Sequence, residues 1–429
     1  MTCTPLHHEQ ELAYTQVLKG ELIAAMGCTE PIAIAYCAAL ATRALGKKPE
    51  TISVWCSGNV IKNSKTVTVP NTGGLKGIKA AALAGAFYGD AERALEVLAG
   101  VTDKQAADIA RLMETMQVPI RLLNEGHALH IRISCAAGND QAEAEILDTH
   151  THIGAIRRNG ETIYSAEPPQ KETNQVRSDA LCLTGILAYA RQASIEVLRS
   201  VLSGQVTHNP AIAREGLNHP WGAQVGKTIL ETRGESERAQ LVARAAAGSD
   251  ARMNGCPMPV VINSGSGNQG LTVSIPVITR AQQLNAGEEK MLRALALSNL
   301  IAIHQKTGIG RMSAYCGAVS AAIGSACGIA FLEDVGDEVI ARTITNALMI
   351  VSGMLCDGAK SSCAAKIAAA LDSALLAYDM AKEERAFLPG EGLMKHDVED
   401  TISAVSRVAR EGMRETDLKV LHVMLEGEN

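Results

Sequence analysis

The stretch MSAYCGAVSAAIGSACGIAFL (residues 312–332) carries no charged side chain over 21 consecutive positions. It consists mostly of alanine, glycine, serine and cysteine, whereas a membrane-spanning helix is normally richer in leucine, isoleucine, valine and phenylalanine. We therefore interpret this stretch as a helix buried at the centre of a soluble helical domain.

The sequence around this stretch predicts two kinds of structure. From about residue 180 to 429 it is rich in alanine, leucine and isoleucine with short glycine-containing breaks, which predicts a large helical domain. Within residues 50–165 apolar and polar residues alternate at period two, as in half-buried strands. Strands are expected at 51–60, 66–70, 118–123, 128–134, 142–147 and around 153–163, with a helical region at 73–98.

We therefore predict an α+β, mostly α fold class, in which a small α/β domain precedes a large all-helical domain. The N-terminal segment reads as helix over residues 10–45, broken at GCTEP (27–31), and is expected to pack on the helical domain. The predicted boundaries are an N-terminal helical segment at 1–49, the α/β domain at 50–165, a polar, proline-containing linker at 166–179 and the helical domain at 180–429.

Composition excludes several classes of protein. A net charge of −6 and 3% aromatic residues argue against a nucleic-acid partner, which needs basic patches and stacking side chains. Eleven cysteines in 429 residues are too few for a secreted disulfide scaffold and indicate reduced thiols. The first residues, MTCTPLHHEQELAY, show no basic segment followed by an apolar run. We expect a cytoplasmic protein with no membrane partner.

Three regions concentrate glycine, serine, asparagine and cysteine almost without charge. They are GCTEP (27–31), the segment 249–270, and GRMSAYCGA (310–318) taken together with SGMLCDGAKSSC (352–363). Such loops between buried helices direct many backbone N–H groups toward one point and favour anion binding.

Helix geometry distinguishes one packing cysteine of the third region from its candidate metal ligands. On one helix Cys316 and Cys327 would lie about 16 Å apart, so Cys327 is expected to be a packing residue. Cys356 and Cys363 flank a glycine- and serine-containing stretch that can fold back on itself. Cys316, Cys356 and Cys363 would suit a [4Fe–4S] cluster with one open iron, but the spacing alone fits three unrelated core cysteines equally well.

Six motifs together resemble the bacterial and archaeal L-cysteine desulfidase family over essentially the whole chain. They are GCTEP (27–31), VPNTGG (69–74), SDARMNG (249–255), INSGSGNQG (262–270), SAYCGA (313–318) and SGMLCDGAKSSCAAK (352–366). Residues 250–366 also resemble, more distantly, the α part of iron–sulfur L-serine dehydratases. The resemblance implies an oxygen-sensitive [4Fe–4S] cluster and a β-elimination that forms pyruvate.

Residue by residue, the resemblance places the metal ligands at Cys316, Cys356 and Cys363. It implies that Cys28 completes the cluster at rest or acts as an acid or base on the substrate. A cysteine near an electropositive cluster would have a lowered pKa, so Cys28 is the first choice for the base. The serine dehydratases end in a cysteine tail that reaches the cluster, whereas this chain ends in LEGEN, and Cys28 is the obvious substitute. The expected substrate-binding residues are Asn263, Ser264, Ser266, Asn268, Gln269 and Arg252.

Other residues remain open at this point. Four side chains could reach the site: Lys62, Asn63, and the two histidines His150 and His152, which would alternate on one strand. Asp250 could anchor Arg252. His304, beside Lys306, is expected on a helix surface. We expect the remaining cysteines, Cys3, Cys37, Cys56, Cys135, Cys182 and Cys256, to be packing residues.

Three functions from different classes follow. The first is a β-eliminating lyase that acts on L-cysteine. The sequence does not distinguish it from an L-serine dehydratase, because the two reactions differ only in the leaving group. The second is a pyridoxal-phosphate lyase using Lys360 or Lys366 as its Schiff-base lysine. The third is a non-enzymatic iron–sulfur sensor. The expected partner is a small amino-acid substrate, and the alanine-rich helical surface suggests a homodimer.

Overall fold

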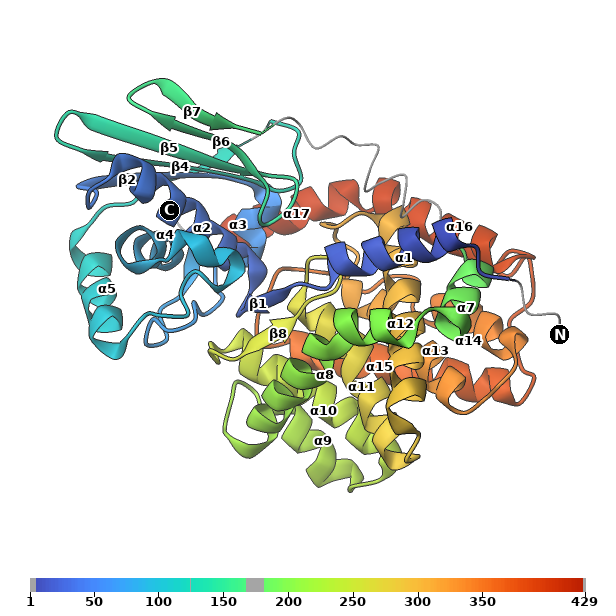
Figure 1. Ribbon diagram of the computed structural model, residues 1–429. Coiled ribbons are helices and arrows are strands. Elements are labelled where there is room, and N and C mark those ends of the chain that lie inside the picture. Colours follow the sequence, from blue (N-terminus) through green and yellow to red (C-terminus); the bar gives the residue numbers. More distant parts are fainter. Residues whose placement is uncertain (1–4, 124, 167–180, 427–429) are drawn as a thin grey trace.

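The computed structural model describes residues 5–123, 125–166 and 181–426. A small part built on a curved sheet lies beside a larger bundle of helices (Figure 1). This confirms the predicted fold class. The predicted linker, 166–179, lies outside the described residues except for Ala166, and the domain boundaries stay a prediction.

The small part is organised by a six-stranded sheet of order β3-β2-β4-β5-β6-β7, in which only the β2–β3 pair is parallel. One face of the sheet carries apolar side chains such as Val54, Ile133 and Ala144, which are fully buried. The strands are β2 (Thr51–Ser57), β3 (Ile120–Leu123), β4 (His130–Ala137), β5 (Asp140–Leu147), β6 (Ile153–Arg158) and β7 (Glu161–Ser165).

Helices cover the apolar face of this sheet. α2 (Thr29–Leu45) packs against β4 and β5 and against α4 (Gly77–Tyr88). The other helical elements of this part are α3 (Gly58–Ser64), a 3-10 helix at Ala91–Glu96 and α5 (Asp103–Thr115). The strand predicted at 66–70 is wrong, because this segment makes only one isolated bridge, Thr68 to Lys76, and is otherwise irregular.

The larger part is a helical bundle around α13 (Gly317–Leu332), the helix predicted from the uncharged stretch. α13 packs against α11, α12, α14 and α15, and Cys327 on it is fully buried. A Cβ at Gly324 would lie 2.4 Å from the Ser298 carbonyl oxygen, so the small residues allow α12 to approach closely. The surrounding helices are α7 (Leu183–Gln192), α8 (Ile195–Asn218), α9 (Val225–Arg233), α10 (Glu237–Met253), α11 (Gly267–Gln283), α12 (Gly287–Ile309), α14 (Asp337–Ile350), α15 (Cys363–Lys382) and α16 (Val398–Arg407).

Both ends of the chain connect the two parts. α1 (His8–Glu21) packs on α7, α8 and α12, as expected of the N-terminal helix, whereas α2 belongs to the sheet side. Between them β1 (Ala24–Met26) pairs antiparallel with β8 (Pro259–Val261) of the helical part. Near the other end α17 (Arg414–Leu425) packs on α3 (Figure 1), and Asp417 pairs with Lys62.

Candidate active site

A cavity of about 110 Å³ lies where the three glycine- and cysteine-containing regions meet. All four cysteines singled out from the sequence line it, together with most of the expected substrate-binding residues. The lining includes Cys28, Arg252, Ser264, Ser266, Asn268, Gln269, Cys316, Cys356 and Cys363.

Four helices begin at this cavity. Cys28 is the N-cap of α2, Ser266 the N-cap of α11 and Cys316 the N-cap of α13, while Cys363 is the first residue of α15. Unpaired backbone N–H groups and the positive end of the helix dipole favour negative charge at such positions. The cavity is therefore electrostatically suited to thiolates and to an anionic ligand.

Two of these cysteine segments are held to each other by backbone hydrogen bonds. The N–H of Cys316 donates to Met354 O at 2.8 Å, and the N–H of Cys356 donates to Ala314 O at 2.7 Å. Cys363 follows after the predicted loop, in which Gly358 adopts φ +94° and lies against the backbone of Lys62. The fold therefore brings together residues that are 40 and 7 positions apart in the sequence.

The surroundings of the three thiols favour the thiolate form of Cys356 but raise the pKa of Cys316 and Cys363. The Cys316 thiol donates a hydrogen bond that lowers the pKa of Cys356 to about 6 against the effect of burial, and the Lys62 and Lys306 ammonium groups lower it further. The same interaction with Cys356, together with burial, raises the pKa of Cys316. Burial lowers the pKa of Lys306 to about 8.

The donor set fits a cluster better than a single ion. The sulfur atoms of Cys316, Cys356 and Cys363 do not all lie within 4.8 Å of one another. A tetrahedral zinc ion with Zn–S bonds of about 2.3 Å would need them closer. A cluster distributes its thiolate ligands over several iron atoms and accepts the wider spacing.

Cys28 lies at the centre of a second network, built around Glu30. Its Sγ donates to Glu30 Oε2 at 3.3 Å, and Asn63 donates to Glu30 Oε1 at 3.0 Å. His150 Nε2 lies 3.7 Å from the same Oε1. The Thr29 hydroxyl lies 3.0 Å from both Glu30 Oε2 and the carbonyl oxygen of Gly265, so the network contacts the helical part.

This network determines the protonation of its members. Burial would raise the pKa of Glu30, but the hydrogen bond and charge of His150, with the Cys28 thiol, lower it to about 2. Burial and the Glu30 carboxylate raise the pKa of Cys28 well above its usual value. The lowered pKa expected of Cys28 refers to the protein with a bound cluster, and it stays a prediction.

The loop before α11 is fixed by a tight turn and by buried amides. Ser264 and Gly265 both adopt left-handed backbone conformations, with φ of +49° and +80°. Asn263 is fully buried; its amide donates to Asn299 Oδ1 at 2.9 Å, and its own Oδ1 accepts from the Ser264 hydroxyl. Asn263 is absent from the cavity lining, so its contacts position the loop from behind.

Comparison with known proteins identifies the family. Residues 92–422 match the family model described as "Serine dehydratase alpha chain". The chain belongs to this family. It is also 47% identical to a UPF0597 protein of Lachnoclostridium phytofermentans over 409 residues, covering 95% of this chain and 98% of the relative. A UPF0597 protein of Desulfitobacterium hafniense is 45% identical, with 96% of each chain covered. A third, from Finegoldia magna, is 44% identical over 96% of this chain and 99% of its own.

Membership in the serine dehydratase alpha-chain family indicates an amino-acid lyase and an association with iron–sulfur clusters. The matched residues include all the cavity-lining cysteines except Cys28. They extend beyond residues 250–366, the region whose sequence resembles the α part of iron–sulfur L-serine dehydratases. Among the described helices, none is long and apolar enough to cross a membrane.

Some side chains lie differently from the sequence-based expectations. His150 and His152 lie in the turn between β5 and β6 rather than on a strand, and only His150 lines the cavity. Asp250 does not pair with Arg252; its carboxylate accepts the N–H of Gly226 at 3.0 Å at the start of α9. Burial, against the backbone hydrogen bonds there, raises the pKa of Asp250 to about 6.

His304 and Lys306 both lie on α12, the helix before Cys316. His304 is partly exposed, and its Nε2 lies 2.6 Å from Glu399 Oε2. Lys306, two residues later on the same helix, is buried and lines the cavity beside the cysteines.

Sequence reasoning missed Glu30, Tyr315 and Arg311, which also line the cavity. Each is a neighbour of a residue that was singled out: Glu30 is part of GCTEP, and Tyr315 precedes Cys316. An acidic residue inside an otherwise uncharged loop was the available signal for Glu30.

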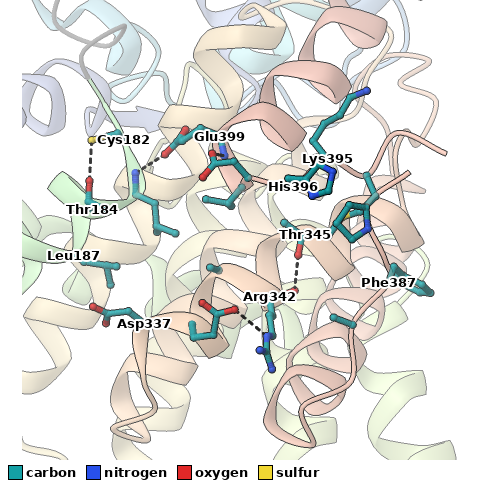
Figure 2. A pocket seen from close by; sticks show the side chains of 18 of the residues that line it. Cys182, Thr184, Leu187, Asp337, Arg342, Thr345, Phe387, Lys395, His396 and Glu399 are labelled. Carbon is teal, nitrogen blue, oxygen red and sulfur yellow. Dashed lines mark hydrogen bonds and ion pairs between the residues drawn. The ribbon is translucent and has the colours of Figure 1, made fainter. Parts of the chain in front are cut away.

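A larger cavity of about 880 Å³ lies elsewhere, between α7, α14 and the segment that leads into α16 (Figure 2). Its polar groups largely bind one another. Glu399 accepts the N–H of Leu183 at 2.7 Å, Cys182 lies 3.4 Å from the Thr184 hydroxyl, and the Thr345 hydroxyl donates to the carbonyl of Arg342. The smaller, cysteine-lined cavity is therefore the candidate site.

Within the described ranges, Glu125, His130 and Glu145 form the one group of metal-type ligands whose atoms all lie within 4.8 Å. They lie on the polar side of the sheet, where Arg132 Nη2 lies 3.1 Å from Glu125 Oε2 and 2.6 Å from Glu145 Oε1. The guanidinium group already supplies the positive charge between the two carboxylates. We read this group as an ion-pair network that stabilises the sheet.

Proposed function

We propose that this protein is a β-eliminating lyase that converts L-cysteine to pyruvate, ammonia and sulfide with a [4Fe–4S] cluster. The observation that supports it is the convergence of Cys28, Cys316, Cys356, Cys363 and Arg252 on one cavity at four helix N-termini. Cys316, Cys356 and Cys363 would hold the cluster. When bound, such a cluster with an open iron supplies a Lewis acid that stabilises the charge of the departing sulfur.

The substrate carboxylate would bind at the start of α11. Arg252 is 2% exposed and donates from Nη1 to Asn268 Oδ1 at 3.1 Å, which orients the guanidinium group against the first turn. The first-turn N–H groups and the Ser266 and Asn268 side chains add neutral donors. Binding there would fix Cα between the loop and the thiols.

The proton transfers would be carried out around Glu30. Elimination requires a base for the Cα proton and an acid for the leaving sulfur. Cys28 is held as a thiol by burial and by Glu30, which suits it to donate a proton or to accept one after its own proton has left. His150 shares the same carboxylate and lines the cavity, so it is the second proton-handling group at hand.

The reaction balances without an external oxidant or reductant. The Cα–H bond breaks, its electron pair forms the Cα–Cβ double bond, and the Cβ–S pair leaves with sulfur as hydrogen sulfide. The resulting aminoacrylate tautomerises and takes up one water to give pyruvate and ammonia.

L-Serine dehydration is the second candidate, because the matching family model is described by that activity. Its leaving group is water rather than hydrogen sulfide, and the remaining steps are the same. A soft thiolate is the better ligand for iron, which favours cysteine.

The pyridoxal-phosphate alternative finds less support. Lys360 and Lys366, the lysines it would use, both pair with Asp357. Lys366 also donates to the carbonyl oxygen of Leu355 at 2.7 Å. A Schiff-base lysine would have to break these contacts.

The deciding experiment is anaerobic reconstitution with iron and sulfide, followed by parallel assays. We expect broad absorption near ~400 nm from a cysteine-ligated cluster. We also expect equal amounts of sulfide and pyruvate from L-cysteine, at a higher kcat/KM than pyruvate from L-serine. Efficient turnover of serine alone would make the protein a serine dehydratase, and turnover of neither by cluster-loaded protein would reject both activities.

A further inference from the structure

Lys306 carries a buried ammonium group without a partner in the part of the chain that the structure describes. The residue lies near the end of α12, is 4% exposed and lines the cysteine-lined cavity. Among the described residues, no carboxylate and no hydrogen-bond acceptor pairs with its Nζ. Burying an unpaired charge is unfavourable, and an apolar side chain of similar length would avoid that cost. An ammonium group at this place therefore indicates an anion that occupies the cavity.

The other cationic side chains around the cavity are already engaged. Three of them pair with carboxylates: Arg311 with Glu21, Lys366 with Asp357, and Lys62 with Asp417. Arg252 donates to Asn268 at the start of α11, where we place the substrate carboxylate. Lys306 is thus the buried cation of this group whose charge the described residues leave unbalanced.

The thiols are the groups whose charge acts most strongly on Lys306. The carboxylates on the cavity are engaged elsewhere, Glu30 in its own network and Asp148 with a histidine. Burial lowers the pKa of Lys306, and the charges of Cys356 and Cys316 oppose that effect. In return the Lys306 ammonium helps to lower the pKa of Cys356. Lys306 therefore acts on the end of the cavity where the proposed metal ligands lie.

A cluster at these thiols would be an anion. Three thiolates outweigh the positive charge of a [4Fe–4S] core, and reduction adds one more negative charge. Net charge and burial are among the factors that set the reduction potential of such a cluster. We infer that the Lys306 ammonium balances the negative charge of the cluster and thereby raises its reduction potential. This inference rests on the proposed function for the presence of the cluster, and it gives Lys306 an electrostatic role without contact to the reacting atoms.

The test is an anaerobic redox titration of the cluster-loaded protein without substrate, followed by the ~400 nm absorption and by electron paramagnetic resonance. Lys306→Met removes the charge and keeps an unbranched side chain. The reduction equilibrium should shift toward the oxidised form by roughly 10–100-fold, and each tenfold change is about 59 mV for a one-electron couple. The shift has this direction because the added electron loses the ammonium group that balances it.

Two further variants separate the charge from other effects of substitution. Lys306→Arg keeps a cation and should leave the reduction equilibrium within about twofold of the wild-type value. Lys290→Met is the matched control, because it removes a lysine from the other end of α12, where Lys290 pairs with Asp334. The two positions are about 24 Å apart along the helix, so this control should not shift the potential.

An unchanged potential in Lys306→Met, with a normal cluster spectrum, would overturn the role of Lys306 and leave the cluster itself in place. If Lys306→Met binds no iron, circular dichroism and the arginine variant decide. A folded Lys306→Met protein without iron, beside an iron-loaded Lys306→Arg protein, would support the need for a positive charge. Loss of iron from both variants would overturn it, and a wild-type protein that binds no iron would reject the proposed cluster together with this inference.

Discussion

The thiol of Cys28 donates to the carboxylate of Glu30 across 3.3 Å, at the N-terminus of α2. Both residues belong to GCTEP and line the cavity together with the three other cysteines, Cys28 buried and Glu30 half-buried. The acid that accepts this hydrogen bond also binds Asn63 and lies beside His150. Glu30 therefore couples the two groups that we propose to move protons.

Glu30→Gln should lower the pKa of Cys28, because it removes the negative charge that, after burial, does most to raise it. The measurement is the pH dependence of Cys28 alkylation, followed by mass spectrometry of the peptide that contains it. The alkylation midpoint should move to lower pH, while kcat falls about 10–100-fold through loss of the charged hydrogen bond. An unchanged midpoint would mean that Glu30 does not control the thiol.

The cluster assignment predicts a sharp division among the cysteines. Cys316→Ala, Cys356→Ala and Cys363→Ala should each abolish the ~400 nm absorption and the activity together. Cys327→Ala, on α13 and fully buried, should retain both at a stability cost of about 1 kcal/mol. Iron and sulfide analysis decides, and a Cys363→Ala protein with full iron content would remove Cys363 from the ligand set.

How much of this site was predictable differs from residue to residue. The uncharged run at 312–332 predicts α13, because a stretch that lacks charge and is also poor in large aliphatic residues suits a helix buried within a protein. The spacing separates Cys327 from the other thiols. The position of His150 was not predictable, because a register argument placed it on a strand whereas the chain turns there. The raised pKa of Cys28 was also hidden, since it depends on burial and on the rotamer of Glu30.

The loop before α11 should contribute to binding of the substrate. Ser266→Ala or Asn268→Ala removes a neutral donor or the partner of Arg252, so KM should rise roughly 5–20-fold with a normal cluster spectrum. The measurements are the KM for L-cysteine from steady-state kinetics and the iron content of each variant. Iron loss in these variants would instead indicate that the loop supports the fold of the cluster site.

The sheet should lose stability in acid through Glu145. Hydrogen bonding from His130, with Arg132, outweighs burial and lowers the pKa of Glu145 from 4.5 to about 2. A carboxyl group whose pKa is lower in the folded than in the unfolded state stabilises the fold at pH values above its unfolded-state pKa. This contribution disappears as the pH falls from about 4.5 toward 2. Glu145→Gln should cost on the order of 2 kcal/mol at pH 7 and progressively less below pH 4.5.

The measurement is the thermal unfolding of the wild-type protein and of Glu145→Gln between pH 7 and 3. Glu143→Gln is the control, because Glu143 pairs with Arg157 at a more exposed position and should shift the curve less. A gap between wild type and Glu145→Gln that stays constant with pH would show that Glu145 is not charged in the way described.

The last prediction concerns Cys28 itself. Cys28→Ala leaves Cys316, Cys356 and Cys363 in place, so the protein should still bind a cluster, while catalysis falls by roughly 10²–10⁴-fold as for a lost acid or base. Cys28→Ser should be almost as damaging if proton transfer is its role, because a hydroxyl is a far weaker acid and base than a thiol at neutral pH. Substantial rescue by serine would instead indicate iron ligation. A Cys28→Ala protein with full iron content and near-normal kcat would transfer the proton role to His150, and His150→Gln would then be expected to show the full loss.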